Sequence, residues 1–162
     1  MKQKHLLKSD FFKELDVLPK QEHVFEKVRS IAKKIGVFYG FQKISTSVVE
    51  EYKRVSSLAR EGFFDAHPPL TAKTKDGTEI LLRSSGIVSA LRMYGDYGMG
   101  ELPQPIKLNF EGESFAVGGE GGIFGRYEIG FVMAGEAGSI AEAELFQVMR
   151  KTLEDLGVTP EE

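Results

Sequence analysis

A helical period in the apolar residues dominates the first part of the chain. Apolar positions recur every three or four residues from Pro19 to Lys34, which predicts an amphipathic helix. Pro19 suits its first turn because a proline has no N–H to satisfy there. Gly36 and Gly40 are expected to end this helix. The alternating residues 41–46 then predict a half-buried strand, and a second helix is predicted over residues 49–60.

The middle of the chain has the pattern of two hairpins separated by a helix. Asp76-Gly77 lies between two apolar-rich runs, and both positions tolerate a positive φ, so the dipeptide predicts a tight two-residue hairpin. A helix over residues 85–94 follows. Two long strands, 106–117 and 123–134, then flank the glycine-rich loop 118–122.

The last predicted helix covers residues 139–156. Ser139 and Glu142 have the spacing of a capping box at its start, and Gly157 is the expected cap at its end. The order of elements favours an α+β fold, an antiparallel sheet covered by helices, over a doubly wound parallel sheet. We expect these helices to pack on one face of the sheet.

Length and composition indicate one folded unit. With 162 residues, of which 41% are hydrophobic, the chain can bury a substantial core. Residues 1–15 are predicted to form a polar tail and residues 16–162 a single core domain. The tail is too polar for a signal peptide, and no apolar run approaches the ~20 residues that span a bilayer. A cytoplasmic protein without membrane contact is therefore expected.

Charge and cysteine content narrow the function classes. The net charge of −3 argues against non-specific nucleic-acid binding, although it leaves room for a specific tRNA contact through a local patch. A chain without cysteine forms neither a disulfide nor a thiolate zinc site. The three histidines lie far apart, and the acidic residues of the first long strand are expected to form a solvated face, so no metal site is predicted.

Three segments stand in collinear order: residues 40–50, Leu81-Leu-Arg-Ser-Ser-Gly, and residues 102–108 with the long hairpin and Tyr127-Glu-Ile-Gly. Together they resemble the histidyl-tRNA synthetases, which are class II aminoacyl-tRNA synthetases. Residues 40–50 are similar to the first class II motif, through which these enzymes form dimers. Leu81-Leu-Arg-Ser-Ser-Gly stands where the histidyl enzymes carry Leu-Arg-Pro-Glu-Gly-Thr. Residues 102–108, the long hairpin and Tyr127-Glu-Ile-Gly follow the order of the second motif. The resemblance runs from residue 16 to residue 157 and implies a partial class II synthetase fold, the first half of the catalytic core.

The residues that carry the family's chemistry are replaced in this chain. The resemblance places Ala116 where the family has the Arg that holds the α-phosphate of ATP, and Arg126 where it has the Phe under the adenine ring. Glu128 and Val132 correspond to its histidine-binding Gln and Glu, and Ser85 corresponds to the Glu that holds the α-ammonium group. Loss of one donor to a developing anion costs on the order of 10²–10³ in rate. The family's third motif, with another ATP-binding Arg, lies beyond residue 162.

Four residues are the ligand-binding candidates, and no residue is predicted to be catalytic. They are Arg83, which the resemblance retains, together with Ser85, Arg126 and Glu128. Arg126 could stack on an adenine ring and Glu128 could bind an amine, whereas an ion pair between them would be structural. ATP and Mg²⁺ are expected only if synthetase chemistry survives.

The replacements favour a non-catalytic histidyl-tRNA synthetase-like module with a binding, regulatory or assembly role. The resemblance implies small-molecule or tRNA sensing as outcomes, because domains of this kind include the regulatory subunit of ATP phosphoribosyltransferase and a sensor of uncharged tRNA. The alternative is a divergent or split histidine–tRNA ligase, with this chain as the N-terminal part of its catalytic core. A pure dimerisation module is a third hypothesis.

Two kinds of protein partner follow from the resemblance. The first is a second copy of the chain, paired through the first-motif helix and strand. The second is another polypeptide that completes the fold. An open sheet edge beside the long hairpin would expose unpaired N–H and C=O groups, so we expect another strand, a second copy or a local rearrangement to cover it.

Overall fold

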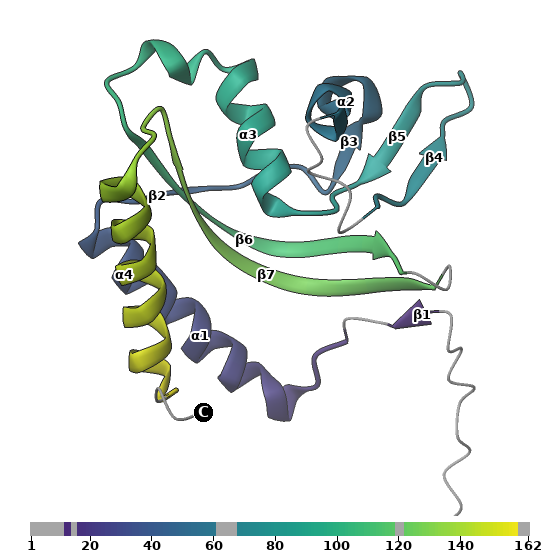
Figure 1. Cartoon of the computed structure of the whole chain (residues 1–162). Coiled ribbons are helices and arrows are strands. Elements are labelled where there is room, and N and C mark those ends of the chain that lie inside the picture. Colours follow the sequence, from purple (N-terminus) through teal and green to yellow (C-terminus); the bar gives the residue numbers. More distant parts are fainter. Residues whose placement is uncertain (1–11, 14–15, 61–67, 119–121, 159–162) are drawn as a thin grey trace, which may run out of the picture.

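A long antiparallel hairpin forms the centre of the molecule (Figure 1). The computed structural model describes residues 12–13, 16–60, 68–118 and 122–158. In chain order their elements are β1 (Phe12–Lys13), α1 (Pro19–Phe38), β2 (Gln42–Ile44), β3 (Val49–Glu51), α2 (Tyr52–Arg60), β4 (Thr71–Lys73), β5 (Glu79–Leu82), α3 (Gly86–Asp96), the short 3₁₀ helix η1 (Met99–Glu101), β6 (Ile106–Val117), β7 (Ile123–Ala134) and α4 (Ser139–Leu156).

The strands form two sheets. β6 and β7 pair over their whole lengths, from Ile106 opposite Ala134 to Val117 opposite Ile123. β2 adds to β6 and β1 adds to β7, both in parallel, which gives the order β1-β7-β6-β2. The second sheet is antiparallel with the order β3-β5-β4. The predicted α+β class with a mainly antiparallel sheet is confirmed, and the two short parallel pairs are an addition to it.

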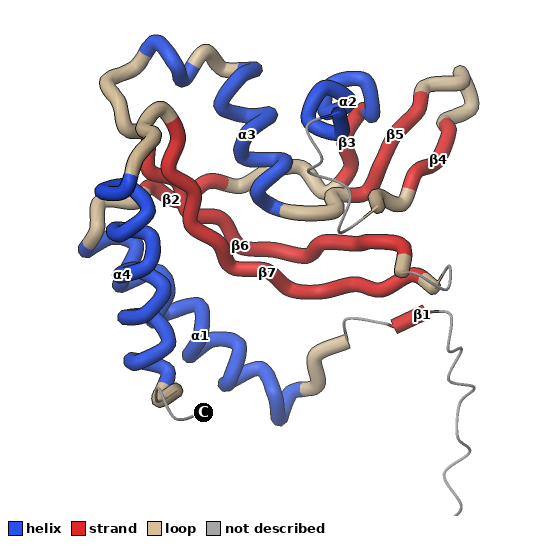
Figure 2. The backbone as a smooth tube through the Cα atoms, in the orientation of Figure 1, coloured by secondary structure: helices blue, strands red, loops and turns tan. Residues whose placement is uncertain are grey.

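Helices lie on both faces of the β6–β7 hairpin, so the expectation of a single covered face is wrong (Figure 2). On one face the start of α3 packs directly against the ring of Phe110. The first residue of α3 is Gly86, and a side chain there would clash with that ring. On the other face α1 places Gly36 against the ring of Phe131. The reason is that β6 and β7 place apolar side chains on both faces of the sheet. Each face must therefore be shielded from water by helices.

Two predicted helix boundaries change in the structure. α1 continues through Gly36, which is buried, and ends before Gly40, where φ is +80°. A Cβ on Gly36 would lie 3.2 Å from the Phe131 ring, so this glycine serves close packing. The helix predicted over 49–60 begins only at Tyr52, because Val49–Glu51 pairs with β5 as a strand.

Two predicted turns also differ in detail. In the β4–β5 hairpin the Gly77 N–H donates to the Thr74 carbonyl at 3.0 Å, and only Gly77 has a positive φ, so the loop is longer than two residues. The capping box predicted at the start of α4 is wrong, because Gly138 is the N-cap and Ser139 is already helical. Gly157 caps the other end of α4 with φ +93°, as predicted.

Candidate functional site

The carboxylate of Glu128 is the centre of a polar cluster between the start of α3 and the β6–β7 hairpin. Its Oε2 accepts hydrogen bonds from the Gly86 N–H at 2.8 Å and from the Ser114 hydroxyl at 2.7 Å. Its Oε1 forms an ion pair with Arg126. The Gly86 N–H is one of the donors that a helix leaves without a helical partner at its first turn, and a carboxylate there is favoured by the helix dipole. The cluster is therefore electrostatically satisfied by its own chain.

Strand periodicity brings these residues together. Arg126 and Glu128 are two positions apart on β7 and so share the face that α3 covers. Ser114 of β6 lies opposite Arg126 in the register. Arg126 also donates to the carbonyl oxygen of Ser84 at 3.3 Å, which links β7 to the segment before α3. The cluster is also largely shielded from solvent, since the side chain of Glu128 is 17% exposed and Ser114 is 1% exposed.

Ser85 lies beside this cluster and has a local function. It is the N-cap of α3, with extended φ and ψ, and its hydroxyl oxygen accepts from the Ile87 N–H at 3.3 Å. Three of the four predicted site residues, Ser85, Arg126 and Glu128, therefore meet around the start of one helix. Their role as ligand-binding residues stays a prediction.

Arg83 is buried behind the cluster, with 5% of its surface exposed. Its Nε and Nη2 donate to the carbonyl of Glu113 at 2.8 and 2.5 Å, and its Nη1 donates to the hydroxyl of Thr46 at 2.8 Å. Gly112 makes room for it, since a Cβ there would lie 2.4 Å from Nη2. Arg83 thus ties β6 to the segment that joins β2 and β3, and these bonds account for its position without a ligand.

Two further positions from the family comparison lie in apolar surroundings. Val132 packs against the buried cluster of Ile44, Ala90, Leu108 and Phe110. Ala116 is 1% exposed and forms a bridge with Pro69. Neither environment offers a charge to a substrate.

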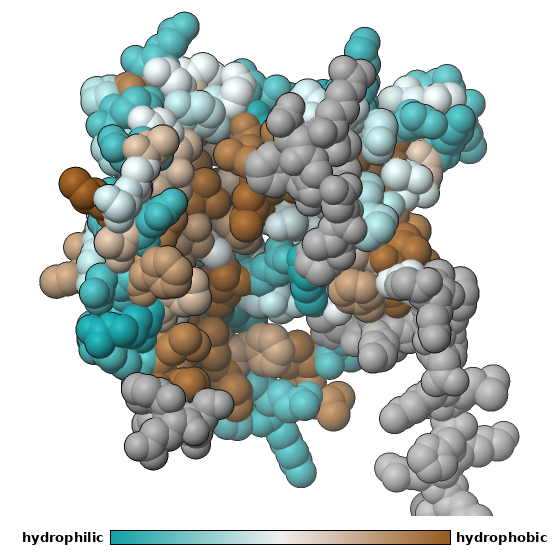
Figure 3. Space-filling view, viewed as in Figure 1, coloured by the Kyte–Doolittle hydropathy of each residue, from teal (hydrophilic) through white to brown (hydrophobic). Residues whose placement is uncertain are grey.

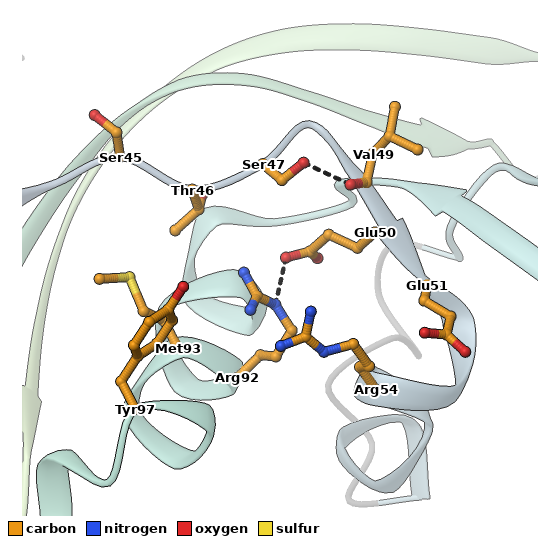
Figure 4. Close-up of a pocket in the computed structure, with 10 residues that line it drawn as sticks. All are labelled: Ser45, Thr46, Ser47, Val49, Glu50, Glu51, Arg54, Arg92, Met93 and Tyr97. Carbon is orange, nitrogen blue, oxygen red and sulfur yellow. Dashed lines mark hydrogen bonds and ion pairs between the residues drawn. The ribbon is translucent and has the colours of Figure 1, made fainter.

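The structure also contains a buried ion-pair network that the sequence did not reveal (Figure 4). Glu50 of β3, which is 6% exposed, accepts from Arg92 Nε at 2.6 Å and from the Ser89 hydroxyl at 3.1 Å. Asp96 accepts from Arg92 at 2.8 Å and from Arg54 at 2.6 Å. The i, i+4 spacing of Arg92 and Asp96 on α3 is a sequence signal for that pair. Glu50 joins through the tertiary fold, which no local spacing indicates.

A polar cleft of about 290 Å³ adjoins this network. Ser45, Thr46 and Ser47 line it on one side, and Met93 and Tyr97 line it on the other (Figure 4). The arginines at its base are already paired with Glu50 and Asp96, so the cleft has little free positive charge for an anion.

Asp96 gives this network an acid-dependent part. The hydrogen bond from Arg92, with the charge of Arg54 adding to it, holds the pKa of the Asp96 carboxyl below its ordinary value of 3.8. A group with a lowered pKa in the folded state stabilises the fold above its unfolded pKa, and that contribution is lost as the pH falls through the folded value. Asp96→Asn is therefore expected to be less stable than the parent chain at neutral pH, and the difference should shrink at about pH 3.

Urea unfolding at the two pH values measures this effect. Glu136→Gln, at an exposed position in the loop before α4, is the matched control and should follow the parent chain at both. A constant difference between Asp96→Asn and the parent would show that the carboxylate charge contributes nothing.

No group of three or more His, Cys, Asp or Glu side chains in the described part gathers where it could hold a metal ion. No helix there is long and apolar enough to cross a membrane.

Two sequence relatives of this chain are histidine–tRNA ligases. The histidine–tRNA ligase of Dehalococcoides mccartyi strain BAV1 is 28% identical over 149 residues, which cover 89% of this chain and 35% of the ligase. The Aquifex aeolicus histidine–tRNA ligase is 27% identical over 148 residues, which cover 88% of this chain and 36% of the ligase. The chain thus spans about a third of the length of the curated relatives it matches. No family model matches the chain.

Solved structures agree with the sequence relatives. An ATP phosphoribosyltransferase regulatory subunit/histidyl-tRNA synthetase from Bacillus halodurans C superposes with a TM-score of 0.77 at 17% identity, covering 95% of this chain and 39% of that one. The apo histidyl-tRNA synthetase of S. aureus gives a TM-score of 0.68 at 23% identity, covering 86% of this chain and 36% of that one. The fold is accordingly that of a class II aminoacyl-tRNA synthetase core. In sequence, the chain is similar to the part of a histidine–tRNA ligase that covers about a third of that enzyme's length.

Proposed function

We propose that this chain is a non-catalytic histidyl-tRNA synthetase-like module with a binding, regulatory or assembly role. The observation that carries the proposal is that the Glu128 carboxylate already has hydrogen-bond and ion-pair partners within its own chain. Its carboxylate stands where the resemblance puts a substrate-binding side chain, yet its oxygens accept from Gly86, Ser114 and Arg126 of its own chain. To pair with Glu128, a substrate ammonium group would have to displace the Arg126 guanidinium, which is held in place by its contacts with Glu128 and the Ser84 carbonyl.

The residues present do not fit ATP in the manner of the family. The strand position for the cation that meets the α-phosphate holds Ala116, which is buried and uncharged. The position under the adenine ring holds Arg126, whose guanidinium is turned to Glu128 and to the Ser84 carbonyl. Val132, at the position of a histidine-binding carboxylate, packs in the apolar core. These contacts support a scaffold from which the adenylation chemistry has been lost.

The direct test is pyrophosphate exchange by the purified chain with histidine and ATP. We expect no turnover above a protein-free blank. Turnover that Arg126→Ala abolishes would contradict the proposal, because it would make Arg126 part of a working site. Arg150→Ala, which removes an exposed arginine from α4, is the control for loss of a charge.

The second candidate is a divergent or split histidine–tRNA ligase, favoured by the names of the sequence relatives, which are histidine–tRNA ligases. Under this candidate the chain gains activity only when the rest of a catalytic core is supplied. Aminoacylation of tRNA by a reconstituted complex, and not by the chain alone, would favour it. A structural neighbour described as an ATP phosphoribosyltransferase regulatory subunit/histidyl-tRNA synthetase shares the fold of this chain, and that fold is compatible with either role.

The same proposal includes the partners and the location of the chain. We propose a cytoplasmic protein that pairs with a second copy through α1 and β2, the first-motif helix and strand. A second polypeptide that completes the sheet is the other proposed partner. A specific tRNA contact stays a hypothesis, which the net charge of −3 does not favour.

A further inference from the structure

A polar cavity of about 320 Å³ lies between α1 and the strands β2 and β6. Helix α1 covers the face of the hairpin opposite to α3, so this cavity is separate from the Glu128 cluster (Figure 2). Its volume is in the range of cavities that hold small molecules. The lining comes from three elements: Glu26, Arg29, Ser30 and Lys33 of α1, Lys43 of β2, and Asn109 and Glu111 of β6.

Helical periodicity explains why α1 gives this cavity a polar wall. The four lining residues of α1 lie within positions 26–33, about two turns, at spacings that bring their side chains to one stripe of the helix. Val28 and Ala32 lie on another side of α1, where they line an apolar groove beside α4. Figure 3 shows hydrophobic side chains gathered near α4, over that groove. The two sides of α1 therefore border surroundings of opposite polarity.

Asn109 supplies an unused amide to the cavity. It lies opposite Lys43 and Phe131 in the two strand registers, and Phe131 packs against Gly36 of α1, so the side chain of Asn109 is on the α1 face. Asn109 is 7% exposed, yet its amide forms no hydrogen bond with any residue that the structure describes. An amide offers two donors and an acceptor oxygen, and nearly all buried ones have partners. The unused amide at the wall of a cavity indicates a ligand.

The cations of the cavity are unequally paired. Lys43 forms an ion pair with Glu111. Arg29 forms one with Glu22 at 3.1 Å, although its Nε is buried without an acceptor in the described part of the chain. Lys33 forms no ion pair with a described residue. The cavity therefore has one cation that remains available to a ligand.

We propose that this cavity binds a small monocarboxylate that carries a hydrogen-bond donor, a hydroxyl or an ammonium group, next to its carboxylate. Lys33 and the amide nitrogen of Asn109 meet the carboxylate, and the amide oxygen of Asn109 accepts from the neighbouring donor. One available cation matches a single ligand charge. A phosphate monoester carries about −1.5 to −2 charges at pH 7, and the carboxylates of Glu26 and Glu111 would repel the excess.

This proposal goes beyond the function proposed above and does not depend on it. Nuclear magnetic resonance of the isotope-labelled full chain tests it with L-lactate, L-alanine, propionate and methyl phosphate at constant ionic strength. We expect lactate or alanine to shift the side-chain amide signals of Asn109 with a dissociation constant on the order of 1 mM, and the tighter of the two identifies the donor. Propionate, which lacks the donor, should bind about two- to tenfold more weakly. Methyl phosphate should bind more weakly than lactate and alanine.

Three variants assign the contacts. Lys33→Gln should weaken binding of the tighter probe by about two- to fivefold, the effect of an exposed charge. Lys34→Gln removes the same charge from the next position, outside the lining, and should leave affinity within about twofold. Asn109→Leu should weaken binding by about tenfold without lowering the midpoint of thermal unfolding, because an apolar group of similar volume replaces an unpaired amide. If Asn109→Leu does not fold, the two lysine variants still decide.

Four outcomes would overturn the proposal. The first is no shift of the Asn109 amide signals with lactate or alanine at tens of millimolar, which would leave that amide to water. The second is an equal loss of affinity in Lys33→Gln and Lys34→Gln, which is a general effect of charge. The third is tighter binding of methyl phosphate than of lactate and alanine. The fourth is a shift of the Asn109 signals with protein concentration in the absence of any probe, which would make this wall a contact between two copies.

Discussion

Arg92→Met is expected to lower the free energy of unfolding by about 3–5 kcal/mol, because it leaves the Glu50 carboxylate buried without its cation. The side chains of Arg92 and Glu50 are 9% and 3% exposed, and their atoms meet at 2.6 Å. Little of the Glu50 side chain reaches solvent, and among the contacts described above only the Ser89 hydroxyl would still donate to its carboxylate. Urea unfolding followed by circular dichroism measures the change.

A double variant separates the cost of an unpaired charge from the loss of attraction. Glu50→Gln/Arg92→Met removes both charges, so it should be more stable than Arg92→Met alone. Arg54→Met is the matched control, since the Arg54 side chain is 51% exposed and its pair with Asp96 is worth about 0–1 kcal/mol. A cost for Arg92→Met no greater than that of Arg54→Met would show that the Glu50 site is open to water.

The central hairpin is the part of the fold that the sequence predicts best. Strands 106–117 and 123–134 agree with β6 and β7 at both ends, because a period of two and a glycine-rich loop are local signals. The strand Val49–Glu51 was missed for the opposite reason. Its residues form a strand because they pair with β5. Glu50 is buried because Arg92 forms an ion pair with it. Both partners lie far from residues 49–51 in the sequence.

In the candidate site, too, local spacing predicts some contacts and the tertiary fold determines the others. Alternation along β7 puts Arg126 and Glu128 on one face, and the ion pair suggested between them is present. The contact of Glu128 with Gly86 depends on the position of α3 over the hairpin, and its contact with Ser114 depends on the pairing of β6 with β7. The spacing of residues along the sequence does not determine the position of α3. The sequence also did not indicate an apolar groove between α1 and α4, which Val28, Ile129 and Met149 help to line. Each helix has an ordinary amphipathic pattern, and only the placement of both helices over β7 leaves a space between them.

Gly86→Ala is expected to destabilise the chain by about 1–3 kcal/mol through overpacking at the contact between α3 and the hairpin. A Cβ on Gly86 would lie 2.0 Å from Phe110 Cε2, and the ring has no free direction, since a Cβ on Gly130 would meet it at 2.3 Å. Any shift of α3 also moves the Gly86 N–H away from Glu128, so packing and the polar cluster should fail together. Gly95→Ala on the same helix has open space and should instead stabilise by roughly 0.5–1 kcal/mol. Thermal unfolding of the two variants tests the contrast, and equal midpoints would mean that the ring of Phe110 moves aside freely.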